Sequence, residues 1–294
     1  MSKQFTFEAI GTHFWIEIWG GITDAELQAT KGRLQLLSSE FNEAYSRFRD
    51  DSYVSVLNRE RKLENPSPEF RALLAYGKEL YLRSGSVFNP LVGHILEAHG
   101  YDADYSFKAT DGADAPSVCN PITDLITSEN EITLACGNLD LGGYGKGYLI
   151  DKMAKDLQSH GIEYFLINGG GDMYGSSDEA GKPLTIYLEH PTQAGQYLIE
   201  TTIQNQGFAA SSPFKRQWKD GDKTYTHIIA DGEVPKLATF IKAKNALEAD
   251  AFATIALLMP EASLPALAHI EHLAIARFDP PTNQLWQTSN FTKL

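Results

Sequence analysis

The sequence predicts an α+β fold, with a large and mostly antiparallel sheet, flanking helices and a single two-lobed domain over residues 1–294. Three observations support this prediction. The chain has 294 residues, of which 43% are hydrophobic and 21% charged, which is ordinary for a globular protein with a sizeable core. Helical and strand-like patterns are interspersed without the regular alternation of a parallel α/β sheet. The sequence contains no internal repeat and no low-complexity tract.

The first half of the chain contains two predicted strands followed by helices. Apolar residues alternate at 5–9 and at 14–18, on either side of Gly11, which predicts two consecutive strands. Residues 101–130 are polar and turn-rich, so we expect a surface excursion there. Apolar residues spaced three and four apart predict amphipathic helices, which we expect at 24–46, from 68 to about 85, and from 91 to 100.

Strands dominate the second half of the chain. The strand predicted at 131–135 leads into a glycine-rich turn and a helix at 148–160, and the strand at 163–167 leads into a second glycine-rich turn. The apolar run at 246–259 has the length of a helix. The remaining short runs predict strands at 183–189, 196–203, 225–229, 236–243, 273–278 and 284–288.

The charge balance restricts the class of partner. Lys and Arg number 25 against 38 Asp and Glu, which gives a net charge of −13. Such a chain repels phosphate backbones and anionic lipids, so we expect neither nucleic acid nor a membrane surface as its main partner. No run of 18 apolar residues predicts a transmembrane helix.

The N-terminus and the cysteines bear on the compartment. The first eight residues lack the apolar core and cleavage site of a signal peptide, so we expect a cytoplasmic protein, with removal of an upstream signal as the alternative. The two cysteines, Cys119 and Cys136, are expected to be free thiols in that reducing compartment, and a single structural bridge is the alternative.

Two glycine-rich segments are candidates for ligand binding. Residues 139–151 contain four glycines in six positions together with Lys146, and residues 168–172 contain three glycines followed by Asp172. Backbone without side chains can approach a ligand closely, and a helix N-terminus after such a turn attracts anions. The first segment matches neither a P-loop nor a dinucleotide-binding motif. A tight strand-to-helix connection and a bulged turn capped by Asp172 are the structural alternatives.

The apolar helix predicted at 246–259 contains a polar pair. Asp250 and Thr254 are four residues apart and therefore lie on one face of a helix that is otherwise apolar. A buried carboxylate is unfavourable unless it is paired or binds a metal, and carboxylate and hydroxyl oxygens suit Mg²⁺ or Ca²⁺. The alternative is that Asp250 stabilises the helix N-terminus while Thr254 bonds back to a carbonyl.

His227 lies in the predicted strand at 225–229 and is a candidate proton acceptor, because histidine titrates near neutral pH. A structural role in the strand is the alternative.

In order along the chain, these segments resemble the FAD:protein FMN transferases, the ApbE-like flavin transferase family. The resemblance covers nearly the whole chain, as one flavin-transferase-like domain. Its most specific part is the D-L-G-x-x-x-K-G-Y segment at 140–148, followed by G-G-D at 170–172 and A-D-x-x-x-T at 249–254. Weaker similarities occur at 10–12, 46–58, 87–90 and 226–229.

The resemblance implies roles for individual residues. Asp250 and Thr254 would hold Mg²⁺ together with the backbone carbonyl of Gly143. His227 corresponds to a histidine proposed as catalytic in such enzymes, and we take Asp172 as a second candidate base. The residues that would contact FAD are Ile10, Phe48, Phe88, Asn89, Asp140, Lys146 and Ile229.

The resemblance also implies a reaction. A Thr or Ser hydroxyl of an acceptor flavoprotein would attack the flavin-side phosphorus of FAD, with Mg²⁺ bound, and AMP would leave. A Mg²⁺-dependent FAD pyrophosphatase, in which water replaces the acceptor, and a non-catalytic FAD-binding protein are the alternatives. Three departures from the family pattern bear on these choices: Phe48 replaces a usual Tyr, Asn89 stands where Asp is common, and residues 230–233 replace the usual D-P-x-T-G.

Overall fold

The computed structural model describes residues 2–110 and 119–292. The chain divides into two compact units. Unit 1 comprises Met1–Glu40, Tyr144–Phe214 and Pro235–Leu294, and unit 2 comprises Phe41–Gly143 and Lys215–Val234. Helix α1 (Asp24–Tyr45) begins in unit 1 and its last turn belongs to unit 2.

Unit 1 is built on an eight-stranded sheet in which all neighbouring strands pair antiparallel. This confirms the predicted fold class. The strand order is β1 (Lys3–Ala9), β2 (Thr12–Ile18), β6 (Phe165–Gly169), β7 (Asp172–Gly175), β10 (Gln206–Ser211), β13 (Ala238–Ala243), β14 (Ala274–Asp279) and β15 (Gln284–Gln287).

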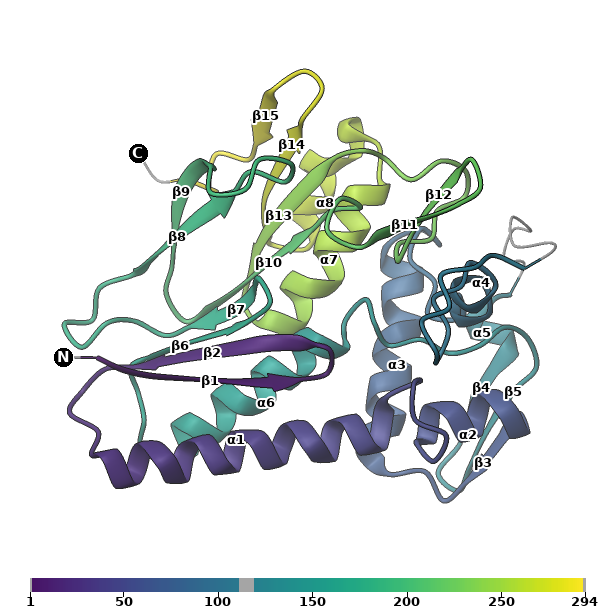
Figure 1. Cartoon of the computed structure of the whole chain (residues 1–294), viewed down its shortest axis with the longest axis horizontal. Coiled ribbons are helices and arrows are strands. Elements are labelled where there is room, and N and C mark those ends of the chain that lie inside the picture. The colour runs from purple at the N-terminus through teal and green to yellow at the C-terminus, as the bar shows by residue number, and fades with distance from the viewer. Residues whose placement is uncertain (1, 111–118, 293–294) are drawn as a thin grey trace. The chain divides into compact units, whose positions relative to one another are not determined.

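Different elements pack on the two faces of this sheet. Successive side chains of a strand point to opposite faces, so two neighbouring residues of β13 show what lies on each face. On β13, Thr239 donates a hydrogen bond to the Ala253 carbonyl of helix α7 (Ala246–Leu258), while Phe240 belongs to an apolar cluster with the hairpin β8 (Leu184–Glu189) and β9 (Tyr197–Ile203). Helix α6 (Gly145–Ser159) packs against α7, β6 and β7, and η1 (Glu261–Ser263) and α8 (Leu264–Ile270) follow α7 (Figure 1). Helix α7 is therefore held between sheet and α6.

Unit 2 contains two smaller sheets and four helices among its described residues. Its core includes Tyr45 and Phe70, whose rings stack, and the half-buried Tyr53 also stacks on Phe70. The helices are α2 (Tyr53–Glu60), α3 (Pro68–Arg83), α4 (Gly93–Ala98) and α5 (Pro121–Asp124); one sheet has the order β3 (Lys62–Glu64), β5 (Glu131–Leu134), β4 (Leu125–Thr127), and the other pairs β11 (Gln217–Asp220) with β12 (Lys223–Thr226).

Some predicted elements differ from the observed ones. Helix α6 begins at Gly145, three residues before its predicted start, and β12 ends at Thr226, so that His227 follows the strand instead of lying in it. Within the range 101–130, residues 121–127 form α5 and β4. Residues 111–118 of that range lie outside the described residues.

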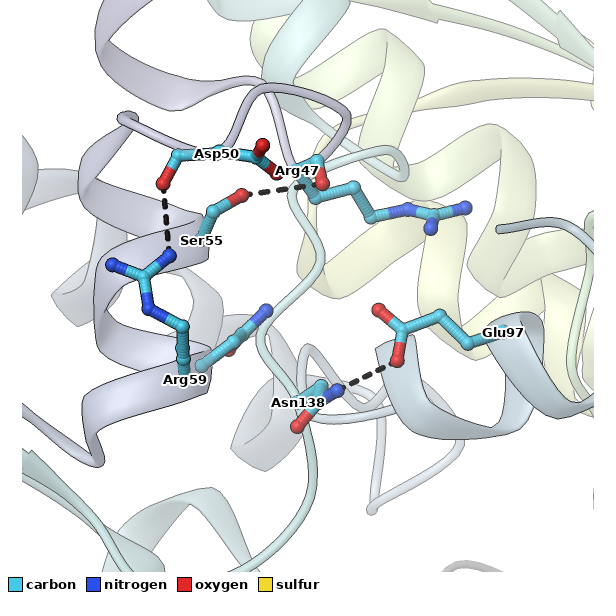
Figure 2. A pocket seen from close by; sticks show the side chains of 7 residues that line it. Arg47, Asp50, Ser55, Arg59, Glu97 and Asn138 are labelled. Carbon is cyan, nitrogen blue, oxygen red and sulfur yellow. Dashed lines mark hydrogen bonds between the residues drawn. The ribbon is translucent and has the colours of Figure 1, made fainter. Parts of the chain in front are cut away.

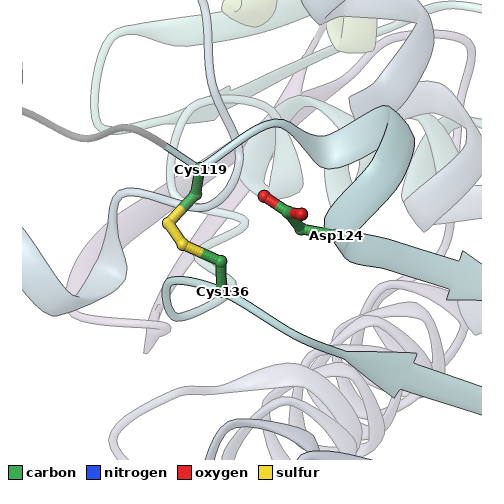
Figure 3. Close-up of side chains that lie close together, drawn as sticks. All are labelled: Cys119, Asp124 and Cys136. Atoms are coloured by element: carbon green, nitrogen blue, oxygen red, sulfur yellow. A yellow bond between two sulfur atoms is a disulfide. The ribbon is translucent and has the colours of Figure 1, made fainter.

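The expectation of two free thiols was wrong, because Cys119 and Cys136 form a disulfide in unit 2 (Figure 3). The bridge closes a loop that contains α5, β4 and β5. Asp124 lies beside the two sulfur atoms, with one carboxylate oxygen accepting a hydrogen bond from the Asn120 backbone N–H. Because both sulfur atoms are bonded to each other, this trio offers no thiolate to a metal.

No helix among residues 2–110 and 119–292 is both long enough and apolar enough to cross a membrane.

Candidate active site

Helix α7 places Asp250 in the interior of unit 1. The Asn245 side chain caps the helix by accepting a hydrogen bond from the Glu248 N–H at 2.8 Å. Asp250 follows within the next turn and is 8% exposed, among neighbours that are buried and apolar. The carboxylate is therefore buried in an apolar helix and needs polar partners.

One partner of Asp250 is the backbone of α6. The Gly147 N–H donates to Asp250 Oδ2 at 2.8 Å. A Cβ atom on Gly147 would lie 2.3 Å from the Ala246 carbonyl oxygen, so only glycine allows the two helices to approach this closely. The glycine-rich segment that the sequence singled out thus forms the first turn of α6 and holds the carboxylate.

Lys146 and Asp172 form an ion pair in the same unit. The Asp172 side chain is 3% exposed and that of Lys146 23% exposed. Asp172 Oδ1 also accepts a hydrogen bond from the Ala210 N–H of β10 at 3.4 Å. The lysine of the first glycine-rich segment is therefore held by the aspartate of the second.

The surroundings of Asp250 make its ionised form unfavourable. Burial raises the pKa of Asp250 above its usual value, and the nearby negative charge of Asp172 raises it further. Lys146 and the Gly147 N–H act in the opposite direction and compensate only in part. A cation bound at Asp250 would stabilise the ionised carboxylate and thereby lower its pKa.

The oxygen atoms near Asp250 fit a Mg²⁺ ion. Thr254 lies one helical turn after Asp250, and its hydroxyl is 3.4 Å from the Ser211 hydroxyl of β10. The groups of unit 1 that could bind a metal here thus include the Asp250 carboxylate and the hydroxyl groups of Thr254 and Ser211, which are hard oxygen ligands. Mg²⁺ is commonly held by one or two carboxylates, with water and substrate phosphates completing its shell. The residues present therefore fit this metal.

Two turns meet at one end of the sheet of unit 1. Ile10 and Gly11 adopt positive φ angles of 45° and 70° in the turn between β1 and β2. A Cβ atom on Gly170 would lie 2.2 Å from Thr12 Oγ1, and the Gly170 N–H donates to the His13 carbonyl at 3.1 Å. The structure thus packs the turn that contains Ile10 against the second glycine-rich segment.

In unit 2, Asp140 is held by a buried arginine. Arg47, whose side chain is 5% exposed, contacts Asp140 Oδ2 through Nε at 2.7 Å, and the Gly142 N–H donates to Asp140 Oδ1 at 2.7 Å. Asn58 exchanges two hydrogen bonds with the backbone of Leu139 and so fixes the chain just before Asp140. No local signal in the sequence indicates a role for Arg47, because its partner Asp140 lies 93 positions away.

Arg47 and Asn58 also line a polar hollow of unit 2 (Figure 2). Its walls are tied together by three hydrogen bonds, from Ser55 to the Arg47 carbonyl, from Arg59 to the Asp50 carbonyl and from Asn138 to Glu97. These bonds leave the walls of the hollow well determined.

Phe48 belongs to an aromatic cluster of unit 2. The Arg47 guanidinium lies 4.2 Å from the centre of the Phe48 ring, and Tyr105 stacks on that ring at 5.0 Å. Tyr101 meets Phe48 edge to face and stacks on Trp218. Phe48 is therefore already in contact with several planar groups.

Phe88 and Asn89 lie in a segment fixed by the backbone of unit 2. A Cβ atom on Gly143 would lie 2.6 Å from the Phe88 ring, so ring and backbone are in close contact. The Asn89 side chain donates to the Cys119 carbonyl and accepts from the Leu91 N–H, both at 2.9 Å. The NH₂ group of Asn89 is thereby hydrogen-bonded to the first residue of the loop that the disulfide closes.

His227 and Ile229 follow β12 in unit 2. His227 Nδ1 lies 3.3 Å from the Arg216 carbonyl oxygen. A carbonyl only accepts hydrogen bonds, so this contact favours the tautomer with the proton on Nδ1 and the basic lone pair on Nε2. Ile229 is half-buried.

The predicted site residues divide between the units. In unit 1 the structure brings together Lys146, Asp172 and Asp250, with Thr254 one turn away and Ile10 in a neighbouring turn. In unit 2 it brings Phe88 next to Gly143, while the remaining predicted residues there are Phe48, Asn89, Asp140, His227 and Ile229. Their roles toward FAD and metal stay predictions.

Comparison with protein families and curated relatives gives a consistent result. The model of the ApbE family matches residues 10–277. A protein named FAD:protein FMN transferase from Rhodobacter capsulatus is 28% identical over 168 residues, which are 55% of this chain and 32% of the relative. One of the same name from Haemophilus influenzae is 24% identical over 229 residues, 71% of this chain and 65% of the relative. The chain thus matches about a third and just under two thirds of the lengths of these two relatives.

Solved structures share the fold. The ApbE protein from Thermotoga maritima superposes with a TM-score of 0.86 at 18% identity, covering 100% of both chains. The flavin transferase ApbE from Vibrio cholerae gives a TM-score of 0.78 at 20% identity, covering 99% of this chain and 98% of that one. At these identities the likeness shows the architecture of the chain.

Proposed function

Because the chain belongs to the ApbE family, we propose that it is an FAD:protein FMN transferase, which moves the FMN part of FAD to a Thr or Ser hydroxyl of an acceptor flavoprotein in a Mg²⁺-dependent reaction and releases AMP. The names of its curated relatives support flavin transfer. The observation that carries the proposal is the buried carboxylate of Asp250, held by α6 next to the Lys146–Asp172 pair.

Asp250 and Thr254 would hold the Mg²⁺ ion, and the family resemblance adds the carbonyl of Gly143 as a third protein ligand. When bound, the ion would neutralise the pyrophosphate of FAD and the charge that develops on the departing phosphate. Phosphoryl transfer depends on positioning and charge neutralisation more than on covalent help from the protein. A site with one carboxylate and one lysine meets that requirement.

Lys146 would offset the remaining phosphate charge. Its ammonium group is held by Asp172, which fixes its position before substrate binds. Such preorganised charge stabilises developing negative charge without further rearrangement. The family resemblance assigns the other contacts with FAD to Ile10, Phe48, Phe88, Asn89, Asp140 and Ile229.

His227 is the base that we propose for the acceptor hydroxyl. The hydroxyl oxygen forms a bond to the flavin-side phosphorus, its proton moves to Nε2 of His227, and the bond between that phosphorus and the bridging oxygen breaks, so that the electron pair leaves with AMP. Asp172 suits this role less well, because its two oxygens already accept from Lys146 and the Ala210 N–H.

The test compares wild-type protein with Asp250→Ala in the presence of FAD, Mg²⁺ and an acceptor flavoprotein. We expect AMP release to fall at least about a hundredfold, as when one contact to developing charge is removed. Chromatography measures AMP and mass spectrometry measures FMN bound to the acceptor. Normal turnover by Asp250→Ala would contradict the metal assignment.

The products of the wild-type reaction distinguish the alternatives. A covalent FMN adduct on the acceptor supports transfer. Free FMN and AMP without an adduct would indicate a pyrophosphatase, and FAD that stays intact for hours with Mg²⁺ would indicate a binding protein.

A further inference from the structure

Asp151 connects the two helices of unit 1 that carry Lys146 and Asp250. It lies on α6, and its carboxylate accepts hydrogen bonds from the backbone of α7. We propose that Asp151 is a positioning residue, which sets α7 against α6 so that Asp250 is held ready for a divalent cation. The consequence of this positioning for catalysis rests on the proposed function.

The hydrogen bonds at the start of α7 show what Asp151 adds. The first N–H groups of a helix have no partner within the helix. The Asn245 side chain satisfies the N–H of Glu248, whereas Asp151 Oδ1 and Oδ2 accept from the N–H groups of Ala246 and Leu247, each at 2.9 Å. Asn is a preferred residue at the start of a helix. Asp151 comes from another helix and therefore fixes where α7 lies.

A hydrogen bond also runs in the opposite direction. Gly147 lies four residues before Asp151 and so on the same face of α6; its N–H donates to Asp250 Oδ2 at 2.8 Å. We call Gly147, Asp151, Ala246, Leu247 and Asp250 the α6–α7 clasp. Since Oδ2 is held, the Asp250 carboxylate keeps one orientation as long as the clasp is closed.

The energetics support a role beyond starting the helix. Burial raises the pKa of Asp151 from 3.8 to about 6, although the two N–H groups of α7 lower it. Burial thus makes the charge of Asp151 costly, and the two hydrogen bonds from α7 offset part of that cost. A role in placing Asp250 explains why a charged group is used here.

The test begins with Asp151→Asn in the full chain. Asparagine keeps the size of the side chain but turns one oxygen into an NH₂ group, which would face a backbone N–H instead of accepting from it. We expect the affinity for Mg²⁺ alone, measured by calorimetry, to fall about tenfold or more, the usual range for residues that orient metal ligands. Amide exchange, measured by NMR, should speed up at Ala246 and Leu247 and also at Gly147.

Asp156→Asn is the matched control. Asp156 is a second aspartate of α6, and it pairs with Arg33 of α1 at 3.1 Å instead of with α7. We expect this variant to keep the Mg²⁺ affinity and the Gly147 exchange rate of the wild-type protein. A merely structural role of Asp151 would lower the melting temperature of Asp151→Asn but leave both quantities unchanged, and that result would overturn the proposal.

A measurement on the unmodified protein decides the matter if Asp151→Asn does not fold. Binding of Mg²⁺ at Asp250 should slow amide exchange at Ala246 and Leu247, because coupling through the clasp is reciprocal. Unchanged exchange there at saturating Mg²⁺ would overturn the proposal. These measurements use no FAD, so failure of the wild-type protein to release AMP would refute the proposed function and leave the clasp to be judged separately.

Discussion

Asp172 occupies a position from which it acts on Lys146. On the sequence alone, Asp172 is a second candidate base beside His227. The structure shows it buried, with its oxygens accepting from the Lys146 ammonium and the Ala210 N–H. An aspartate bound in this way holds the Lys146 ammonium group in place, so we expect Asp172 to affect catalysis through the position of Lys146.

A double-mutant cycle tests this assignment. We expect Asp172→Asn and Lys146→Met each to reduce FAD turnover, and the double variant to lose no more than Lys146→Met alone, because the second change then removes nothing further. Turnover is measured as AMP released at saturating Mg²⁺. If Asp172 were the base, the double variant would lose about a hundredfold more than Lys146→Met, the range of general-base catalysis.

At the scale of elements, the close approach of α6 and α7 depends on a residue without a side chain. The packing brings the N-terminal turns of the two helices into backbone contact at Gly147, where Ala246 and Asp250 lie opposite. Periodicity in the sequence indicated α7 but placed the start of α6 three residues late, since four glycines in the segment 142–147 are typical of a turn. Tertiary packing nevertheless keeps Gly145 and Gly147 in the helix.

Glycine-to-alanine substitutions in two helices should therefore have opposite effects. At Gly147 the new Cβ would lie 2.3 Å from the Ala246 carbonyl oxygen, and we expect a loss of about 2 kcal/mol in the free energy of unfolding. Gly32 in α1 has no atom within 4 Å of such a Cβ and is exposed, so Gly32→Ala should stabilise the protein by about 1 kcal/mol.

Urea unfolding measures both changes. A Gly147→Ala variant as stable as the wild-type protein would show that the backbone contact between α6 and α7 is looser than described.

At the scale of the whole molecule, sequence patterns predicted what depends on local periodicity. The alternating strands β1 and β2 and the apolar helix α7 were confirmed, whereas the short elements α2, β7, β10 and β11 were not predicted. The partners of site residues were also not predicted. The pair Arg47–Asp140 and the contact of Asp151 with Ala246 join segments about a hundred positions apart, and only tertiary packing brings such segments together.

The disulfide bears on the compartment in which the molecule folds. The predicted cytoplasmic location rested on the N-terminal sequence and stays a prediction. Disulfides persist in oxidising compartments and are rare in the reducing cytosol, so the state of the Cys119–Cys136 bridge in the cell tests that prediction. The bridge spans 17 positions, and in the chain-entropy picture a loop of that size stabilises a fold by about 3 kcal/mol.

Thiol alkylation of protein taken directly from its native cells tests the state of the bridge. Cells are quenched in acid, the protein is denatured, and an alkylating reagent is added with or without prior reduction. We expect no adduct without reduction and two adducts after it, because the sulfur atoms of Cys119 and Cys136 are bonded to each other. Two adducts without reduction would show that the cysteines are thiols where the protein works, and would support a cytoplasmic location. In that case the Cys119 carbonyl that accepts from Asn89 would be held by the surrounding backbone alone.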